Sequence, residues 1–213
     1  MRTVAIAGGH GKIALLLGQM LAERGDAVRG LIRNPDQEGD LRAVGIEPVI
    51  CDLENEGDVA SAVRGTDAVV FAAGAGPGSG DARKKTVDLG GAVKLIEAAK
   101  SEGVSRYLIV SSMGADKAPE DGSEGFGAYL QAKFEADEAV RASGLDYTIV
   151  RPGGLTDDPG TGLVTVAEHL DRGQVPRADV AAVLLACLDE PATIGRSFDL
   201  ISGDTPIPTA LHG

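Results

Sequence analysis

The sequence has few aromatic residues and little sulfur. It contains no Trp, three Tyr, four Phe and two Cys, Cys51 and Cys187. Two thiols, each in an apolar run, are too few for a disulfide framework or a four-thiolate metal site, so both are expected to be core residues. His169 and His212 have no partners at metal-ligand spacing, and no metal site is expected. The core is therefore predicted to consist of Ala, Val, Leu and Ile.

Positive charge and long apolar runs are also scarce. The 213 residues include 20 Lys and Arg against 32 Asp and Glu, a formal net charge of −12. An acidic surface repels nucleic acid and anionic lipid headgroups, so neither is expected as a partner. No run reaches the roughly 18 apolar residues of a membrane span, and no secretory signal is visible. We expect a soluble, cytoplasmic protein with one domain over residues 1–213.

Apolar runs of strand length alternate with helical patterns along the chain. Strands are predicted at 3–7, 27–32, 47–51, 68–72, 107–111, 147–150 and 197–200. Helices are predicted at 12–24, 36–44, 56–63, 83–102, 129–143 and 177–189. Glycines at 25, 45, 65, 103 and 144 follow five of these helices, where left-handed C-caps are common. This alternation predicts an α/β fold, with a doubly wound parallel sheet of about seven strands and helices on both faces.

Three loops interrupt the alternation, at 74–80, 114–127 and 151–162. Each follows an apolar strand, so all three are expected at the carboxyl edge of the sheet, where such folds bind ligands. The loop at 114–127 is acidic and is predicted to be a solvated lid, with Phe126 as its substrate-facing group.

The stretch AIAGGHGKIA, at the first strand-to-helix turn, places Gly8, Gly11 and Ala14 at G-x-x-G-x-x-A spacing. Gly8 permits a tight turn, Gly11 lets backbone N–H groups approach a pyrophosphate, and Ala14 lets the helix pack closely on the sheet. An ordinary strand-to-helix turn is the alternative interpretation. The position of the motif at the start of an alternating chain favours a dinucleotide site.

The end of the second predicted strand indicates which dinucleotide binds. An NAD site places an acidic residue there, whereas this sequence has Ile32 and Arg33. Arg33 can form a charged fork around a ribose 2′-phosphate, and Lys12 or His10 could add a second donor. We therefore expect NADP(H) in preference to NAD(H). The alternative is that Arg33 is a solvated turn residue before Pro35.

Two later strand ends complete the nucleotide site. Asp52, followed by Leu53, is a candidate acceptor for the adenine amine. The small side chains of Ala72, Ala73 and Gly74 would let a ribose lie on the backbone.

Tyr129 and Lys133, in YLQAK, are four residues apart and would share one face of a predicted helix. Ser112, in RYLIVSSMG, ends the fifth predicted strand and would lie at the same edge of the sheet. With these residues the chain resembles the short-chain dehydrogenase/reductase superfamily. The similarity covers nearly the whole sequence through GGHGKIA, AAG, VDLGGAVKLIEAAKSEGVSRYLIVSS, YLQAK and YTIVRPGGL.

DYTIVRPGGLTDDPGTGLVTV and SFDLISGDTPI further resemble the small atypical branch of that superfamily, often described as NAD(P)-binding or epimerase/dehydratase-like. This resemblance implies a compact Rossmann-like domain with a short substrate-covering part in 151–176 and 195–213. Several members of the branch keep the cofactor fold but lack a complete active site. Monomers and homodimers both occur among such proteins, and no residue decides between them here.

The resemblance implies three catalytic residues, Ser112, Tyr129 and Lys133. Ser112 would orient the substrate oxygen, Tyr129 would exchange a proton with it, and Lys133 would favour the phenolate and bind the nicotinamide ribose. Asp88 stands where many relatives carry an Asn that holds a relay water, which puts that relay in doubt. The full cofactor set is Gly8, His10, Gly11, Lys12, Ile13, Arg33, Asp52, Leu53, Ala72, Ala73, Gly74, Lys133, Pro152 and Gly153.

The favoured function is an NADP-dependent oxidoreductase that acts on a small carbonyl, alcohol or quinone-like substrate, or epimerises one by transient oxidation. A non-catalytic NADP(H)-binding regulator is the first alternative. A flavin or tetrapyrrole reductase, which needs hydride transfer but not Tyr129, is the second.

Overall fold

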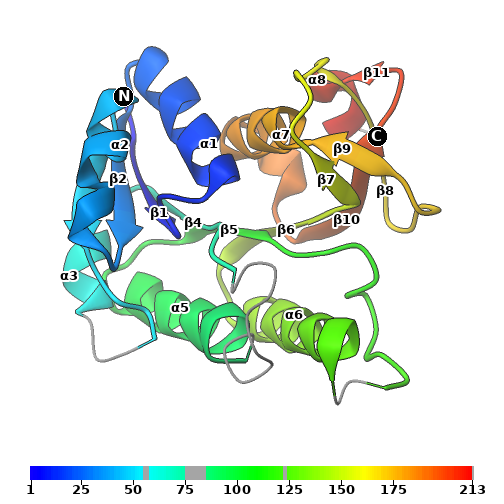
Figure 1. The fold of residues 1–213 in the computed structure, drawn as a ribbon, viewed down its shortest axis with the longest axis horizontal. Coiled ribbons are helices and arrows are strands. Elements are labelled where there is room, and N and C mark those ends of the chain that lie inside the picture. Colours follow the sequence, from blue (N-terminus) through cyan, green and yellow to red (C-terminus); the bar gives the residue numbers. More distant parts are fainter. Residues whose placement is uncertain (55–57, 75–84, 122–123, 213) are drawn as a thin grey trace.

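A nine-stranded sheet forms the middle layer of the computed structural model, which describes residues 1–54, 58–74, 85–121 and 124–212 (Figure 1). The strand order is β11-β8-β10-β6-β5-β4-β1-β2-β3. The strands of this sheet are β1 (Thr3–Ala7), β2 (Ala27–Ile32), β3 (Glu47–Ile50), β4 (Ala68–Phe71), β5 (Arg106–Val110), β6 (Asp146–Pro152), β8 (Leu163–Ala167), β10 (Arg196–Ser202) and β11 (Thr205–Pro206). A separate parallel pair joins β7 (Gly154–Thr156) to β9 (Gln174–Pro176).

The seven strands predicted from the sequence form the parallel part of the sheet, from β3 to β10. The α/β class and the doubly wound arrangement are confirmed. The expectation of about seven strands is too low, because β8 returns antiparallel to β10 and β11 pairs with β8. Both additional strands follow the 151–162 loop, where the prediction placed only a substrate-covering part.

Helices cover both faces of the sheet (Figure 1). One face carries α1 (Lys12–Glu23), α2 (Glu38–Ala43), α7 (Arg177–Asp189) and α8 (Ile207–Leu211). The other carries α3 (Val59–Val63), α5 (Gly91–Ser101) and α6 (Gly125–Ala142). Three short turns complete the described elements: η1 (Pro35–Gln37), η2 (Lys85–Gly90), which is a π-helical turn, and η3 (Pro191–Thr193).

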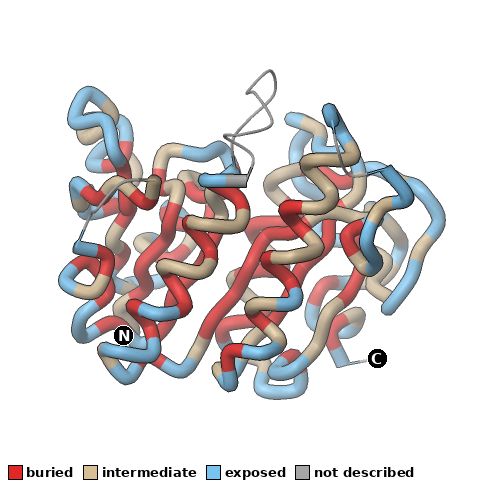
Figure 2. The backbone as a smooth tube through the Cα atoms, turned by 90° about the horizontal axis from the view of Figure 1, so that it is seen from below, coloured by how far each residue is buried: buried red, intermediate tan, exposed pale blue. Residues whose placement is uncertain are grey.

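Alternate residues of the central strands enter two separate cores. In β1, Val4 and Ile6 pack under α1 and α7, whereas Ala5 and Ala7 face α3 and α5. A strand buried on both faces explains why these segments appear in the sequence as continuous apolar runs. Figure 2 shows the buried strands enclosed between partly exposed helices. No helix in the described part of the chain is long and apolar enough to cross a membrane.

The helix ends follow the predicted pattern closely. Each of the five predicted C-cap glycines has a positive φ, between 71° and 91°. The predicted helix at 129–143 in fact begins at Gly125, four residues earlier. Much of the 74–80 loop, the start of the 56–63 helix and residues 83–84 lie outside the described residues, so predictions there have no counterpart in the structure.

Candidate functional site

The first strand-to-helix turn packs directly against two neighbouring strands. Gly8 has φ +76°, and a Cβ on it would lie 2.6 Å from the Cα of Ala73. A Cβ on Gly9 would lie 2.7 Å from the Cα of Gly30. Only glycine fits at these two positions, because a side chain would collide with backbone atoms.

The N-terminus of α1 faces the space beside this turn. Gly11 is its N-cap residue, and its own N–H donates to the Gly8 carbonyl at 2.8 Å. No side chain caps the helix, and its first turn contains no acidic residue. Uncapped N–H groups and the positive end of the helix dipole suit an anion. The glycine turn therefore fits the pyrophosphate of a dinucleotide, as the sequence indicated.

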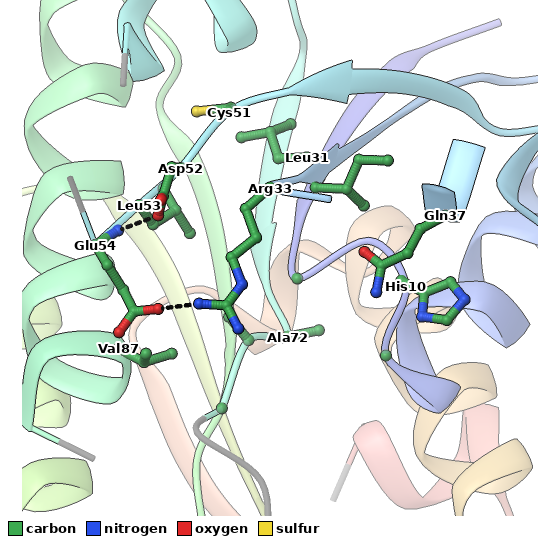
Figure 3. Close-up of a pocket in the computed structure, with 15 residues that line it drawn as sticks. His10, Leu31, Arg33, Gln37, Cys51, Asp52, Leu53, Glu54, Ala72 and Val87 are labelled. Atoms are coloured by element: carbon green, nitrogen blue, oxygen red, sulfur yellow. Dashed lines mark hydrogen bonds and ion pairs between the residues drawn. The ribbon is translucent and has the colours of Figure 1, made fainter. Parts of the chain in front are cut away.

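A cavity of about 350 Å³ opens beside the turn (Figure 3). Nine predicted cofactor residues line it: Gly8, His10, Gly11, Arg33, Asp52, Leu53, Ala72, Ala73 and Gly74. Six residues outside the predicted cofactor set also line it: Leu31, Ile32, Gln37, Cys51, Glu54 and Val87. The predicted residues outside this lining are Lys12, Ile13, Lys133, Pro152 and Gly153.

Arg33 reaches across the cavity to Glu54 (Figure 3). Its Nη1 lies 2.6 Å from Glu54 Oε2, while the side chain of Arg33 is half exposed. Glu54 Oε1 also accepts a hydrogen bond from Thr86 at 3.2 Å, and the Glu54 N–H donates to Asp52 at 2.9 Å. The cation predicted to recognise a 2′-phosphate is thus paired with a carboxylate from the end of β3.

The other two predicted phosphate donors, His10 and Lys12, have carboxylate partners as well. His10 Nε2 lies 2.8 Å from Asp40 Oδ2. Lys12 contacts Asp157, which also pairs with Arg177 at 2.7 Å. Lys12 and Arg177 lower the pKa of Asp157, so the carboxylate is held in its charged form. Asp157 therefore connects the start of α1 to the start of α7.

Packing within the protein itself accounts for two further predicted cofactor residues, Ile13 and Gly153. Ile13 is buried in the core and is not among the residues that line the cavity. A Cβ on Gly153 would lie 2.3 Å from the carbonyl oxygen of Gly173, and the Gly153 N–H donates to the Leu200 carbonyl. The close approach that requires glycine at position 153 is therefore to the chain itself.

Lys133 is buried between α6, η2 and the end of β5. Its Nζ lies 2.9 Å from Asp88 Oδ1 and donates to the Val110 carbonyl at 3.1 Å. The same Nζ is 5.8 Å from the centre of the Tyr129 ring. Burial by itself lowers the pKa of Lys133, but Tyr129 and Asp88 raise it above its ordinary value. The ammonium is therefore charged and fixed next to the phenol.

Ser112 lies at the same strand edge. Its Oγ donates to the Met113 carbonyl at 3.3 Å, and the Met113 N–H donates to Pro152 at 3.0 Å. The β5–β6 pairing thus continues past the ends predicted for both strands. This continuation places Ser112 beside Pro152, on the strand whose Val110 carbonyl holds Lys133.

Tyr129 stacks on Phe126, with ring centroids 5.8 Å apart and an interplanar angle of 29°. Phe126 is 66% exposed, although it is a large apolar side chain. Both residues lie in the first turns of α6, which begins early enough to bring Phe126 onto the helix.

Arg151 forms an internal ion pair. Its Nε lies 2.9 Å from Asp137 Oδ2, and both side chains are almost completely buried. Burial raises the pKa of Asp137, against the opposing effect of Arg151. No cluster of His, Cys, Asp or Glu suited to a metal ion occurs among the residues that the structure describes.

Comparison with known proteins assigns the chain to a family. The model of an NAD(P)H-binding family matches residues 8–191. A Bacillus subtilis protein, named an uncharacterized sugar epimerase, is 42% identical over 210 residues, which cover 98% of each chain. The chain belongs to the NAD(P)H-binding family, within the atypical short-chain dehydrogenases/reductases.

Solved structures agree with this assignment. A Bacillus halodurans protein, whose name proposes an NAD-dependent epimerase/dehydratase, has a TM-score of 0.91 and 38% identity, covering 100% of this chain and 99% of the other. An anaerobillin reductase from Escherichia coli O157:H7 has a TM-score of 0.80 and 25% identity, covering 95% and 98%.

Proposed function

We propose that this protein is an NADP-dependent oxidoreductase that uses Tyr129 to exchange a proton with a small carbonyl or alcohol substrate. The observation that carries this proposal is the buried Lys133 ammonium, held by Asp88 and the Val110 carbonyl and 5.8 Å from the Tyr129 ring centre. A fixed positive charge beside a phenol stabilises the negative oxygen that remains when the proton leaves.

The cavity beside the glycine turn would hold the cofactor. The N-terminus of α1 would bind the pyrophosphate, and Arg33 would bind the ribose 2′-phosphate once it shares or leaves Glu54. When bound, the nicotinamide would give or take the hydride that the reaction requires. Lys133 and the Pro152 loop lie beyond the cavity, at the neighbouring strand ends, on the side where the substrate would meet the cofactor.

The residues of the chain would handle the proton and the substrate oxygen. The Ser112 hydroxyl would orient this oxygen, and the Tyr129 hydroxyl would donate a proton to it during reduction or accept one during oxidation. Phe126, exposed and stacked on Tyr129, would offer an apolar face to the rest of the substrate. The name of one relative, a sugar epimerase, fits a reaction that passes through a carbonyl.

The variant Tyr129→Phe tests this function. Oxidation of NADPH is followed by absorbance with a panel of aldehydes, ketones, quinones and keto sugars, and NADPH affinity is measured by fluorescence. We expect turnover to fall by about 100-fold or more, within the range typical of a lost acid/base group, while affinity stays unchanged. Full turnover by Tyr129→Phe would contradict the proposal.

One relative favours a second candidate, reduction of a tetrapyrrole, since the similar Escherichia coli protein is named an anaerobillin reductase. A planar, conjugated substrate of this class needs hydride transfer but no proton from Tyr129. Turnover of a linear tetrapyrrole or flavin that survives Tyr129→Phe would support it. Tight NADPH binding without turnover of any substrate would support a regulator instead.

A further inference from the structure

Asp88 is a fully buried carboxylate. It lies in the π-helical turn η2, immediately before α5. Single π-helical turns often occur at functional sites, because they point one side chain in a direction that a regular helix cannot. Here the turn brings the Asp88 carboxylate to 2.9 Å from the Lys133 ammonium.

The Asp88 carboxylate also borders the predicted cofactor site. A Cβ on Gly74, which lines the cavity, would lie 3.4 Å from Asp88 Oδ1. The carboxylate therefore lies beside the cavity lining at Gly74 and contacts the Lys133 ammonium. A Cβ at position 74 would be in ordinary van der Waals contact with it.

The charges around this pair come from three elements. Tyr129, Lys133 and Asp137 are on α6, and Asp88 is on η2. Asp137 is neutralised by Arg151 of β6 at 2.9 Å. Among the described residues, the Asp88 carboxylate thus offsets part of the positive charge of Lys133 beside Tyr129.

We propose that Asp88 is a positioning residue that fixes the Lys133 ammonium and weakens its stabilisation of a negative charge on Tyr129. This inference rests on the proposed function of Tyr129. A lone ammonium would favour the phenolate, whereas an ammonium paired with a buried carboxylate favours it much less. Asp88 would therefore bias the site toward reduction of a carbonyl near neutral pH. Asn at this position would remove the bias while keeping nearly the same shape.

The composition of the chain makes a direct test possible, because it has three Tyr and no Trp. Burial raises the pKa of Tyr107, so this residue stays protonated. The tyrosinate absorbance of the cofactor-free protein is measured as a function of pH, once in the wild type and once in Tyr129→Phe. The difference between the two titration curves is the contribution of Tyr129. The same subtraction is made in the Asp88→Asn background. Glu97→Gln, which removes an exposed negative charge from α5, is the matched control.

In Asp88→Asn, the Tyr129 signal should appear at a pH lower by about one unit, the size typical of a single nearby charge. Glu97→Gln should leave the signal in place. If Asp88→Asn does not fold, Asp88→Ser, which keeps a hydroxyl but no charge, should give the same shift. An unchanged or higher midpoint in the folded variant would overturn the proposal.

This titration uses neither cofactor nor substrate, so its result is independent of the proposed function. Full turnover by Tyr129→Phe would refute the catalytic role of Tyr129 whatever the titration gives. A shifted titration together with a Tyr129-dependent reaction would support both proposals. In that case the pH optimum for alcohol oxidation should also move lower in Asp88→Asn.

Discussion

Arg33 lies in the cavity already paired with Glu54, so a phosphate has to compete with a carboxylate for it. Arg33→Ala should weaken NADPH binding by about 1.5–3 kcal/mol, the usual worth of hydrogen bonds to charged groups. NADH, which lacks the 2′-phosphate, should bind nearly as before. Arg42→Ala, which removes an exposed arginine of α2 paired with Glu38, is the control, and both affinities are measured by fluorescence titration. Equal losses for the two cofactors would contradict the assignment.

Gly8 and Gly25 distinguish two reasons why a turn requires glycine, a positive φ and a lack of space for a Cβ. Both have a positive φ, but a Cβ on Gly8 meets the backbone of Ala73, whereas nothing lies within 4 Å of one on Gly25. Gly25→Ala should therefore cost only the backbone strain, about 1–2 kcal/mol. Gly8→Ala should cost a further ~1–3 kcal/mol from overpacking. Urea unfolding measures both, and equal losses would contradict this explanation.

The residues that line the cavity could be predicted only by residue type and by their position at strand ends. Gly8, Arg33 and Asp52 were predicted in this way, because the end of each parallel strand reaches the same edge of the sheet. Their partners could not be predicted. Glu54 follows another strand, and Asp157 contacts Lys12 from 145 residues away. Such pairs depend on the side-by-side packing of distant segments, which no local pattern records.

At the scale of elements, the Asp137–Arg151 pair connects α6 to β6 inside the protein. Arg151→Met should destabilise the fold by about 3–5 kcal/mol, because it leaves the buried Asp137 without its cationic partner. The double variant Asp137→Leu/Arg151→Met removes both charges and should recover most of this loss. Thermal and urea unfolding of the single and double variants measures the difference. A double variant as unstable as the single one would show that packing, and not charge, is responsible.

The main strands and helices were predicted within a few residues, whereas the C-terminal additions were missed. Central strands such as β1 and β5 are buried on both faces and appear as unbroken apolar runs. In contrast, β8 is mostly half-exposed, and β11 has two residues, one of them Pro206. Neither strand has a periodic pattern of apolar residues in the sequence. β8 is a strand because it pairs with β10, and its own sequence does not indicate one.

At the scale of the whole molecule, the reactivity of the two thiols should distinguish local opening of the cavity from global unfolding of the protein. Cys187 is fully buried in the core, where burial raises its pKa to about 12. Cys51 lines the cavity, and burial followed by the nearby Asp52 raises its pKa. At pH 8 both should be mostly protonated, so a thiol reagent should label the native protein slowly.

We expect Cys51 to be labelled through local opening of the cavity and Cys187 only through global unfolding. Saturating NADPH should therefore slow the labelling of Cys51. The single-thiol variants Cys51→Ala and Cys187→Ala separate the two rates in a colorimetric thiol assay. Labelling of Cys187 as fast as Cys51 in the native protein would contradict this expectation.

Both outermost strands of the main sheet contain proline, Pro48 in β3 and Pro206 in β11. Proline has no N–H to offer an incoming strand, and such residues protect sheet edges against unwanted pairing. The antiparallel return of β8 also covers the side of β10 that a purely parallel sheet would leave open. Growth of the sheet by addition of strands from other molecules is thus opposed at both margins, which protects this protein against fibrous aggregation at high concentration.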